Sequence, residues 1–527
     1  MSKLSTFLKP RTSQLAYATG LCVYTLLIIV EFVAVLQINN GVFVYTLDDP
    51  YIHLALAENI AKGHYGINLG EYSAPSSSIL WPFLLAPFSF SPLSPLIINF
   101  IFGLGLVLIF VKAAEFLAQE TNLPWTELVK ALLVFLLILC TNLVGLVFIG
   151  MEHTLQVLLV SMIAYGLLLE NRTSEARQWL LIIVVLAPLV RYENMAISAA
   201  ALLYLADRGH RKEAALAGCA TVVLLLTFSL FLLTHNLGFL PTSVNAKLNP
   251  RGDVSSLESI FLTLLINHGE RQALVLLLGI FVINMFLFRS REAENSQTRP
   301  LLLATVAAVL LHFLFGKTNW YNRYEIYIWA FFLLILLYSI VTTYLSKSHT
   351  SQDFRRSAAI VVGIIFLLPF ASLPYLTSLV TLPIASNNIY QQHYQMSKLV
   401  TDYYKRPVAV NDIGYVAYRN DYYVLDLFGL ASEQALEFRQ SRTDSDWMEQ
   451  MLEERDIELA MIYDEWFPNV PDSWTPLGQL EIGGKRISAG YERVSFYATQ
   501  DADLDYIRST LNNFSGMLPA GTSFRFQ

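Results

Sequence analysis

Two adjacent aspartates, Asp48 and Asp49, open the segment LDDPYIHLALAENIAKGHYGINLGE. Pro50 follows the pair and Gly63 lies near its end, a pattern that predicts a short helix with Asp49 as its N-cap. Capping explains one of the two carboxylates but not both, because a second one beside it adds repulsion. Asp48 is therefore the favoured general base, a carboxylate that orients and deprotonates an attacking hydroxyl.

Further ionisable side chains follow in loops that are expected on the same side of a membrane. Cations among them could stabilise a phosphate leaving group as its charge develops. Acids and cations on one face suit transfer of a group from a phosphate donor. The candidates for this role are Glu152 as a second acidic position and, for binding the donor phosphate or substrate, His53, Arg191, Glu193, Lys247 and Arg323.

A metal ion is left open by the sequence. Asp48, Asp49 and Glu152 together offer the oxygen ligands that Mg²⁺ or Mn²⁺ takes, although their spacing does not demand one. The three cysteines, Cys22, Cys140 and Cys219, all lie in apolar runs and are interpreted as packing residues. No phosphate-binding glycine loop competes for the site, and a net charge of −7 without a long basic run gives no indication of nucleic-acid binding.

The elements that must position these residues are membrane spans. The 527 residues are 54% hydrophobic and 15% charged, whereas soluble domains carry roughly 25% charged residues. Apolar runs of about 20 residues, the length that crosses a bilayer core, recur up to about residue 380. They predict about eleven spans, at 14–37, 93–118, 127–149, 154–170, 178–190, 194–206, 214–237, 271–288, 300–316, 324–345 and 357–379.

The orientation of the spans depends on segment 79–90, which is apolar but broken by Pro82 and Pro87. If this segment does not cross and the N-terminus is cytoplasmic, most lysines and arginines of the loops lie inside, as membrane proteins prefer. The predicted topology therefore places the first outer loop, residues 38–92 with the acidic pair, outside the cell. An i, i+4 stripe of Ile52, Leu56 and Ile60 predicts that its helix is amphipathic and lies on the membrane surface.

The last part of the chain has a different composition. Strand-like apolar runs alternate there with polar helical ones: strands are expected at 407–411, 422–427, 458–463 and 495–499, and helices at 432–440 and 444–453. This pattern predicts an extracytoplasmic soluble α/β domain over residues 385–527, after a transmembrane domain over residues 1–384. Counting the predicted spans between them places this domain on the same side of the membrane as Asp48.

The motifs resemble those of the C-type glycosyltransferase superfamily, and most closely the bacterial members of the mycobacterial arabinofuranosyltransferase type. The first loop resembles DDAxIxxRYAxNLxxGxGxxxNxGE of that family. In the same order follow GMEHTLQ (family GLExxL), RYEN (RPEG), GFLPTSVNAK (GxxLPNTxxAK) and VAVNDIGYVAYRNDYYVLDLFGLAS (GxIxYxxxxxxxDxxGL). The resemblance implies inverting transfer of a sugar from a polyprenyl-phosphate donor at the outer face of the plasma membrane.

Residue by residue, Asp48 and Asp49 match the family's acidic pair and Glu152 its second acidic position. Arg191, Glu193 and Lys247 match the RPEG and PNTxxAK motifs. Three departures concern the donor and acceptor more than the reaction class. Leu54 or a neighbour replaces the arginine of the first helix, Tyr192 replaces the proline of RPEG, and Thr242-Ser243 replaces Asn-Thr.

The expected partners are a polyprenyl-phosphate-linked sugar and a glycan, lipid or protein acceptor of the cell envelope. One alternative is a transporter or flippase of lipid-linked sugar, which would need its charges near the bilayer midplane. The other is a non-catalytic envelope assembly protein, which leaves the acidic pair unexplained. The sequence does not identify the sugar, the acceptor or the linkage.

Overall fold

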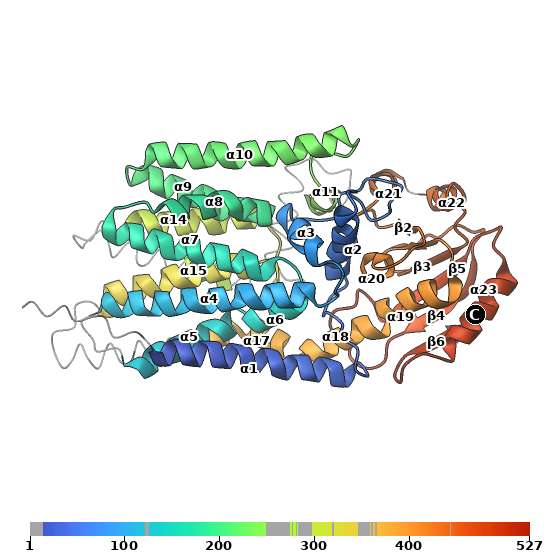
Figure 1. Ribbon diagram of the computed structural model, residues 1–527, viewed down its shortest axis with the longest axis horizontal. Helices are drawn as coiled ribbons and strands as arrows, with labels where there is room; N and C mark the ends of the chain where they lie inside the picture. The colour runs from blue at the N-terminus through green and yellow to red at the C-terminus, as the bar shows by residue number, and fades with distance from the viewer. Residues whose placement is uncertain are drawn as a thin grey trace, which may run out of the picture.

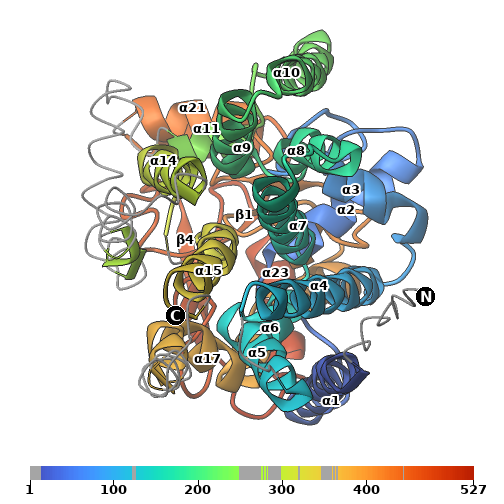
Figure 2. The same ribbon diagram turned by 90° about the vertical axis from the view of Figure 1, so that its left-hand side faces the viewer.

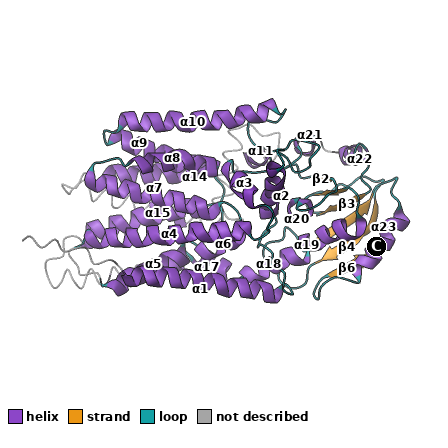
Figure 3. Cartoon of the chain, in the orientation of Figure 1, coloured by secondary structure: helices purple, strands orange, loops and turns teal. Residues whose placement is uncertain are grey.

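The chain folds into a bundle of long helices at one end and an α/β domain at the other (Figure 1). The computed structural model describes residues 14–121, 126–248, 275–276, 278–280, 282, 298–318, 321–345, 359, 362–363, 366–442 and 444–527. Among the described residues, strands occur only at the C-terminal end of the molecule (Figure 3). The predicted class, a helical membrane protein with a C-terminal α/β domain, is confirmed.

The helices of the bundle run side by side along the long axis of the molecule, as the end-on view shows (Figure 2). Among the described residues, six helical stretches are long and apolar enough to cross a membrane, and two shorter apolar helices, α8 and α14, accompany them. Many of their large apolar side chains are exposed, as expected of a surface that faces lipid. The described bundle helices are α1 (Gln14–Ile38), α4 (Ser94–Gln119), α5 (Glu127–Cys140), α6 (Leu143–Ile149), α7 (His153–Thr173), α8 (Gln178–Val190), α9 (Met195–Asp207), α10 (Arg211–Thr234), α14 (Arg299–Phe315), α15 (Ile326–Ile340) with its π-helical end η4 (Val341–Leu345), and α17 (Leu373–Val380).

Most predicted spans coincide with these helices to within a few residues. The span predicted at 127–149 is interrupted: α5 ends at Cys140, Asn142 is left-handed with a φ of 50°, and α6 begins at Leu143. The span predicted at 271–288 and the first half of the one at 357–379 lie almost wholly outside the described residues. The number of spans therefore stays a prediction.

The proline-rich segment at 79–90 forms two short pieces, α3 (Leu80–Leu85) and the 3₁₀ turn η1 (Ala86–Phe88). Nine helical residues rise about 14 Å, less than half of a bilayer core of about 30 Å. The segment is separate from α4, which begins at Ser94. The prediction that it does not cross on its own is in accord with this geometry.

The helix expected in the first loop exists as α2 (Asp49–Ala61) and is followed by Gly63 with a φ of 84°. Two predictions about it are wrong. The helix begins at Asp49, so Asp48 and not Asp49 holds the N-cap position, and Asp48 makes no capping side-chain bond. The helix is also buried on nearly all sides and does not lie open on a membrane surface, because the C-terminal domain covers it through α20 (Gly414–Ala417).

The C-terminal domain contains a six-stranded sheet in the order β2-β1-β3-β5-β4-β6. The strands β1, β2 and β3 are parallel, while β5, β4 and β6 join them antiparallel. The strands are β1 (Val408–Val410), β2 (Val424–Asp426), β3 (Leu459–Ile462), β4 (Thr475–Glu481), β5 (Arg493–Ala498) and β6 (Ser523–Phe526). The four predicted strands correspond to β1, β2, β3 and β5.

Helices connect this sheet to the bundle and cover its faces. The chain enters the domain through α18 (Leu382–Gln391), α19 (His393–Lys398) and the π-helix η5 (Leu399–Tyr404). The remaining helices are α21 (Glu433–Ser441), α22 (Asp446–Glu453), both predicted, and α23 (Leu504–Ser515). The short α11 (Thr242–Leu248) follows the bundle helix α10 and packs against α21.

Candidate active site

The acidic pair lies where the first loop meets the C-terminal domain, and its two carboxylates have different surroundings. The side chain of Asp49 is 32% exposed, and Arg323 donates from Nη2 to its Oδ1 at 3.1 Å. Asp48 is only 6% exposed. The prediction that the C-terminal domain lies on the same side as Asp48 is confirmed, since the two are in direct contact.

Both carboxylate oxygens of Asp48 accept backbone N–H groups of α20. Gly414 N donates to Oδ2 at 2.7 Å and Tyr415 N to Oδ1 at 2.8 Å. A Cβ on Gly414 would lie 2.2 Å from the Asp48 carbonyl oxygen, so only glycine fits this approach. Burial raises the pKa of Asp48 to about 6, against the lowering effects of His393 and of the two N–H groups. Asp48 thus joins the first loop to the C-terminal domain.

Two residues that the sequence analysis did not single out complete the surroundings of Asp48. His393, at the start of α19, places Nε2 3.0 Å from Oδ2 of Asp412, which follows β1. Burial alone would lower the pKa of His393, but Asp48 and Asp412 raise it overall. Asp412 lies in VNDIGY, a motif that was quoted for its likeness but not for its side chains. The sequence feature that could have indicated Asp412 is its position directly after a predicted buried strand.

Among the described residues, Asp48, His393 and Asp412 are close enough to one another to bind a metal ion. Ligand atoms of Asp48, His393 and Asp412 all lie within 4.8 Å of one another. Two carboxylates and an imidazole suit Zn²⁺ or Mn²⁺, and each Asp48 oxygen keeps a lone pair beside its N–H bond. Of the three ligands that the sequence offered for a metal, Asp48 belongs to this cluster, whereas Asp49 pairs with Arg323 and Glu152 with Arg191.

A second charged network surrounds Glu152, which is fully buried just before α7. Arg191 Nη1 donates to Glu152 Oε1 at 2.6 Å, and Nη2 of the same arginine donates to Glu193 at 2.8 Å. His53 Nε2 lies 3.6 Å from the other Glu152 oxygen, and His53 Nδ1 contacts Ser76 at 3.2 Å. The structure therefore brings four predicted site residues, His53, Glu152, Arg191 and Glu193, into direct contact.

The tyrosine Tyr324 connects this network to the acidic pair. The guanidinium carbons of Arg191 and Arg323 lie 5.7 and 5.1 Å from the centre of its ring. Both arginines are 2% exposed, and Nε of Arg323 is buried without a hydrogen-bond partner. Arg323, which pairs with Asp49, and Arg191, near the same tyrosine ring, are thus two guanidinium groups of the kind that binds phosphate. Tyr324 directly follows the predicted Arg323 in the sequence but was not itself predicted.

Lys247 lies in α11, and its side chain is outside the described residues, so its place relative to Asp49 stays a prediction. Its neighbour in sequence Ser243 is described: Ser77 of the first loop donates to the Ser243 hydroxyl at 3.3 Å. The segment GFLPTSVNAK therefore begins against the first loop, as a site residue at Lys247 requires.

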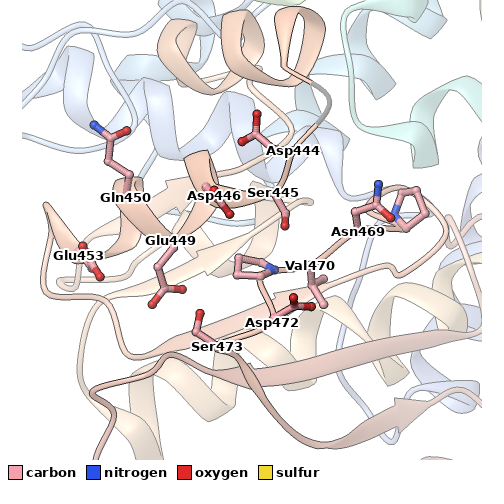
Figure 4. Close-up of a pocket in the computed structure, with 12 residues that line it drawn as sticks. Asp444, Ser445, Asp446, Glu449, Gln450, Glu453, Asn469, Val470, Asp472 and Ser473 are labelled. Atoms are coloured by element: carbon pink, nitrogen blue, oxygen red, sulfur yellow. The ribbon is translucent and has the colours of Figure 1, made fainter.

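A separate groove of about 800 Å³ opens between α22 and the loop 468–473 of the C-terminal domain (Figure 4). Its lining carries the carboxylates of Asp444, Asp446, Glu449, Glu453 and Asp472. None of these residues contacts the acidic pair or the arginines described above. The groove is therefore not part of the candidate active site.

The chain was compared with known families, curated proteins and solved structures. Residues 387–502 match a family model described as a domain of unknown function (DUF8728). No curated protein matches the chain. Similar solved structures include the apo oligosaccharyltransferase of Archaeoglobus fulgidus, with 10% identity, a TM-score of 0.45 and coverage of 95% of this chain and 76% of that chain.

Two further structures hold lipid phosphates. The oligosaccharyltransferase AglB of A. fulgidus, in complex with an inhibitory peptide and a dolichol-phosphate, is 13% identical, with a TM-score of 0.44 and coverage of 92% and 75% of the two chains. ArnT from Cupriavidus metallidurans, bound to undecaprenyl phosphate, is 12% identical, with a TM-score of 0.46 and coverage of 92% and 99%. The likeness is distant, and none of the three is an arabinofuranosyltransferase.

Proposed function

We propose that the chain is a membrane glycosyltransferase that moves a sugar from a polyprenyl-phosphate donor to an extracytoplasmic acceptor with inversion. The observation that supports this most is the pairing of the partly exposed Asp49 with Arg323, beside Arg191 and Tyr324. A base and two buried guanidinium groups in one place are what attack on a phosphate-linked sugar requires.

In the proposed reaction the acceptor hydroxyl attacks the anomeric carbon from the side opposite the phosphate. The bond between that carbon and the phosphate oxygen breaks, and its electron pair stays on the leaving polyprenyl phosphate. Arg323 and Arg191 stabilise the charge that develops there. Asp49 accepts the proton of the hydroxyl, and Arg323 holds its carboxylate in place.

The base is assigned to Asp49 and not to Asp48, which the sequence favoured. The raised pKa of Asp48 would suit a base near neutral pH. The burial that raises this pKa, however, also separates the carboxylate from an acceptor, and both of its oxygens already accept N–H groups. A general base must first be within reach of the hydroxyl, and only then does its pKa matter. Asp48 is therefore assigned a structural role: it holds the C-terminal domain against the site, either by its own hydrogen bonds or together with a divalent cation bound by Asp48, His393 and Asp412.

The donor class can be tested with the purified full-length protein in lipid nanodiscs. Radiolabelled sugars would be supplied either on polyprenyl phosphate or on a nucleotide, with envelope glycolipids and oligosaccharides as acceptors. Transfer from the lipid donor alone, with inverted anomeric configuration in the product, is the expected result. Transfer from the nucleotide donor, or retention of configuration, would overturn the proposal.

A further inference from the structure

A chain of aromatic contacts extends from the surroundings of Asp48 across the C-terminal domain. The ring centres of Phe428 and Trp466 are 4.9 Å apart, those of Trp466 and Tyr463 are 5.1 Å apart, and those of Tyr463 and Tyr491 are 5.6 Å apart. Tyr463 is buried, while Phe428, Trp466 and Tyr491 are partly exposed. These four residues are called the aromatic row below.

The aromatic row lies at a position that the topology favours for ligands. Phe428 follows β2 and Tyr463 follows β3, so both stand at the carboxyl ends of parallel strands, as Asp412 does after β1. In open parallel sheets this edge is the usual place for ligand binding. The row is also joined to the candidate active site, because the Tyr463 hydroxyl donates to Gln392, the residue before His393, at 2.5 Å.

An arginine stands at each end of the aromatic row. The guanidinium carbon of Arg439 lies 3.9 Å from the ring centre of Phe428, and that of Arg486 lies 5.7 Å from the ring centre of Tyr491. Among the described residues neither forms an ion pair with a carboxylate, whereas Arg191 and Arg323 of the active site both do.

In the described part of the chain, few side chains contact the two guanidinium groups directly. Nε of Arg439 is buried without a hydrogen-bond partner. Asp426 is close enough to act on Arg439 electrostatically, but its oxygens accept the backbone N–H groups of Phe428, Gly429 and Ala431. Arg486 donates only to the carbonyl oxygens of Ala489 and Gly490.

We propose that the aromatic row with Arg439 and Arg486 binds an acidic oligosaccharide, which is the acceptor or the growing end of it. This inference rests on the proposed function, since it gives the acceptor class of that same site. The apolar faces of sugar rings stack on aromatic side chains, and arginine binds carboxylate and phosphate in a two-pronged manner. The partly exposed rings of Phe428, Trp466 and Tyr491 occur here together with the two arginines. The negative groups on the sugar are uronate carboxylates or phosphate esters.

The test is direct binding to the full-length protein in nanodiscs, measured by calorimetry without any donor. The probes are a uronate oligosaccharide, a phosphorylated oligosaccharide and a neutral oligosaccharide of the same length. At least one acidic probe is expected to bind about tenfold or more tightly than the neutral one, and the comparison between the two acidic probes identifies the charged group. Equal affinity for all three probes would overturn the proposal.

Variants separate the row from unspecific charge effects. Arg439→Gln should weaken binding of the acidic probe about tenfold, and Trp466→Ala should weaken all three probes. Arg442→Gln is the matched control, because Arg442 also lies 3.9 Å over a phenylalanine, Phe438, near the end of α21 but outside the row. An equal loss of affinity for the acidic probe in Arg439→Gln and Arg442→Gln would contradict a specific binding site at the aromatic row.

Glu465, which is exposed and precedes Trp466, offers a test with the opposite sign. Glu465→Gln removes a negative charge beside the row and should strengthen binding of the acidic probe. Binding and transfer fail independently. Transfer from a lipid donor without selective acidic binding would remove this inference and keep the proposed function. Selective binding of the acidic probe without transfer from any lipid donor would remove the proposed function and keep the binding of an acidic oligosaccharide.

Discussion

The attachment of the C-terminal domain to the first loop can be tested by Asp48→Asn. The substituted side chain keeps one oxygen but turns an NH₂ group toward the N–H of either Gly414 or Tyr415. A hydrogen bond to a charged group contributes about 1.5–3 kcal/mol, and leaving a buried donor unpaired costs about 1–3 kcal/mol. Both figures describe the loss of the same bond and are not added, so the substitution should destabilise this contact by about 1.5–3 kcal/mol.

Hydrogen exchange of the amides of Gly414 and Tyr415 reports on this contact directly. Since 1.4 kcal/mol corresponds to a factor of ten, at least one of the two amides should exchange more than about tenfold faster in Asp48→Asn than in the wild type. The exposed Asp421, close in sequence to α20, supplies the control Asp421→Asn, which should leave both rates unchanged. Unchanged protection of both amides in Asp48→Asn would refute the role given to Asp48.

Three more predictions concern the surroundings of the acidic pair. The metal-stripped protein should take up Zn²⁺ or Mn²⁺, and His393→Ala should lower the affinity at least about tenfold; equal uptake by the variant would exclude His393 as a ligand. Arg323→Gln should raise KM for the donor more than Arg323→Lys, which keeps the charge; unchanged KM in both would remove Arg323 from donor binding. Gly414→Ala should lower the melting temperature, because its Cβ would meet the Asp48 carbonyl oxygen at 2.2 Å; an unchanged melting temperature would show that the backbone can move apart there and that glycine is not required.

Local patterns in the sequence predicted much of the fold. The apolar runs that became α1, α4 and α7 needed only their length and composition, since a span is specified by one segment alone. Alternating composition likewise revealed β1, β2 and β3 of the C-terminal domain. Several elements were not predicted, because their formation depends on pairing with segments that are distant in the sequence. The strand β6 pairs with β4 and carries mostly exposed residues, so its segment has no buried apolar run.

The candidate site was predicted in part for the same reason. Residue type and loop position were enough to select Arg191, Glu152 and Arg323: Arg191 pairs with Glu152, and Arg323 pairs with Asp49. The different surroundings of Asp48 and Asp49 could not be predicted, because Asp48 is buried by α20, which lies 366 residues further along the chain. His393 and Asp412 were missed because their contact with Asp48 exists only after the C-terminal domain docks on the first loop.

The most direct measurement is the rate of sugar transfer from a polyprenyl-phosphate donor by Asp49→Asn, with the protein at equal amounts in nanodiscs. General-base catalysis contributes 10²- to 10⁴-fold, so kcat should fall at least about a hundredfold. Glu58→Gln, on the same helix but paired with Arg419 outside the network, should transfer at the wild-type rate. Near-normal transfer by Asp49→Asn would contradict the account, and near-normal transfer by Asp49→Asn with an inactive but fully folded Asp48→Asn would return the base to Asp48.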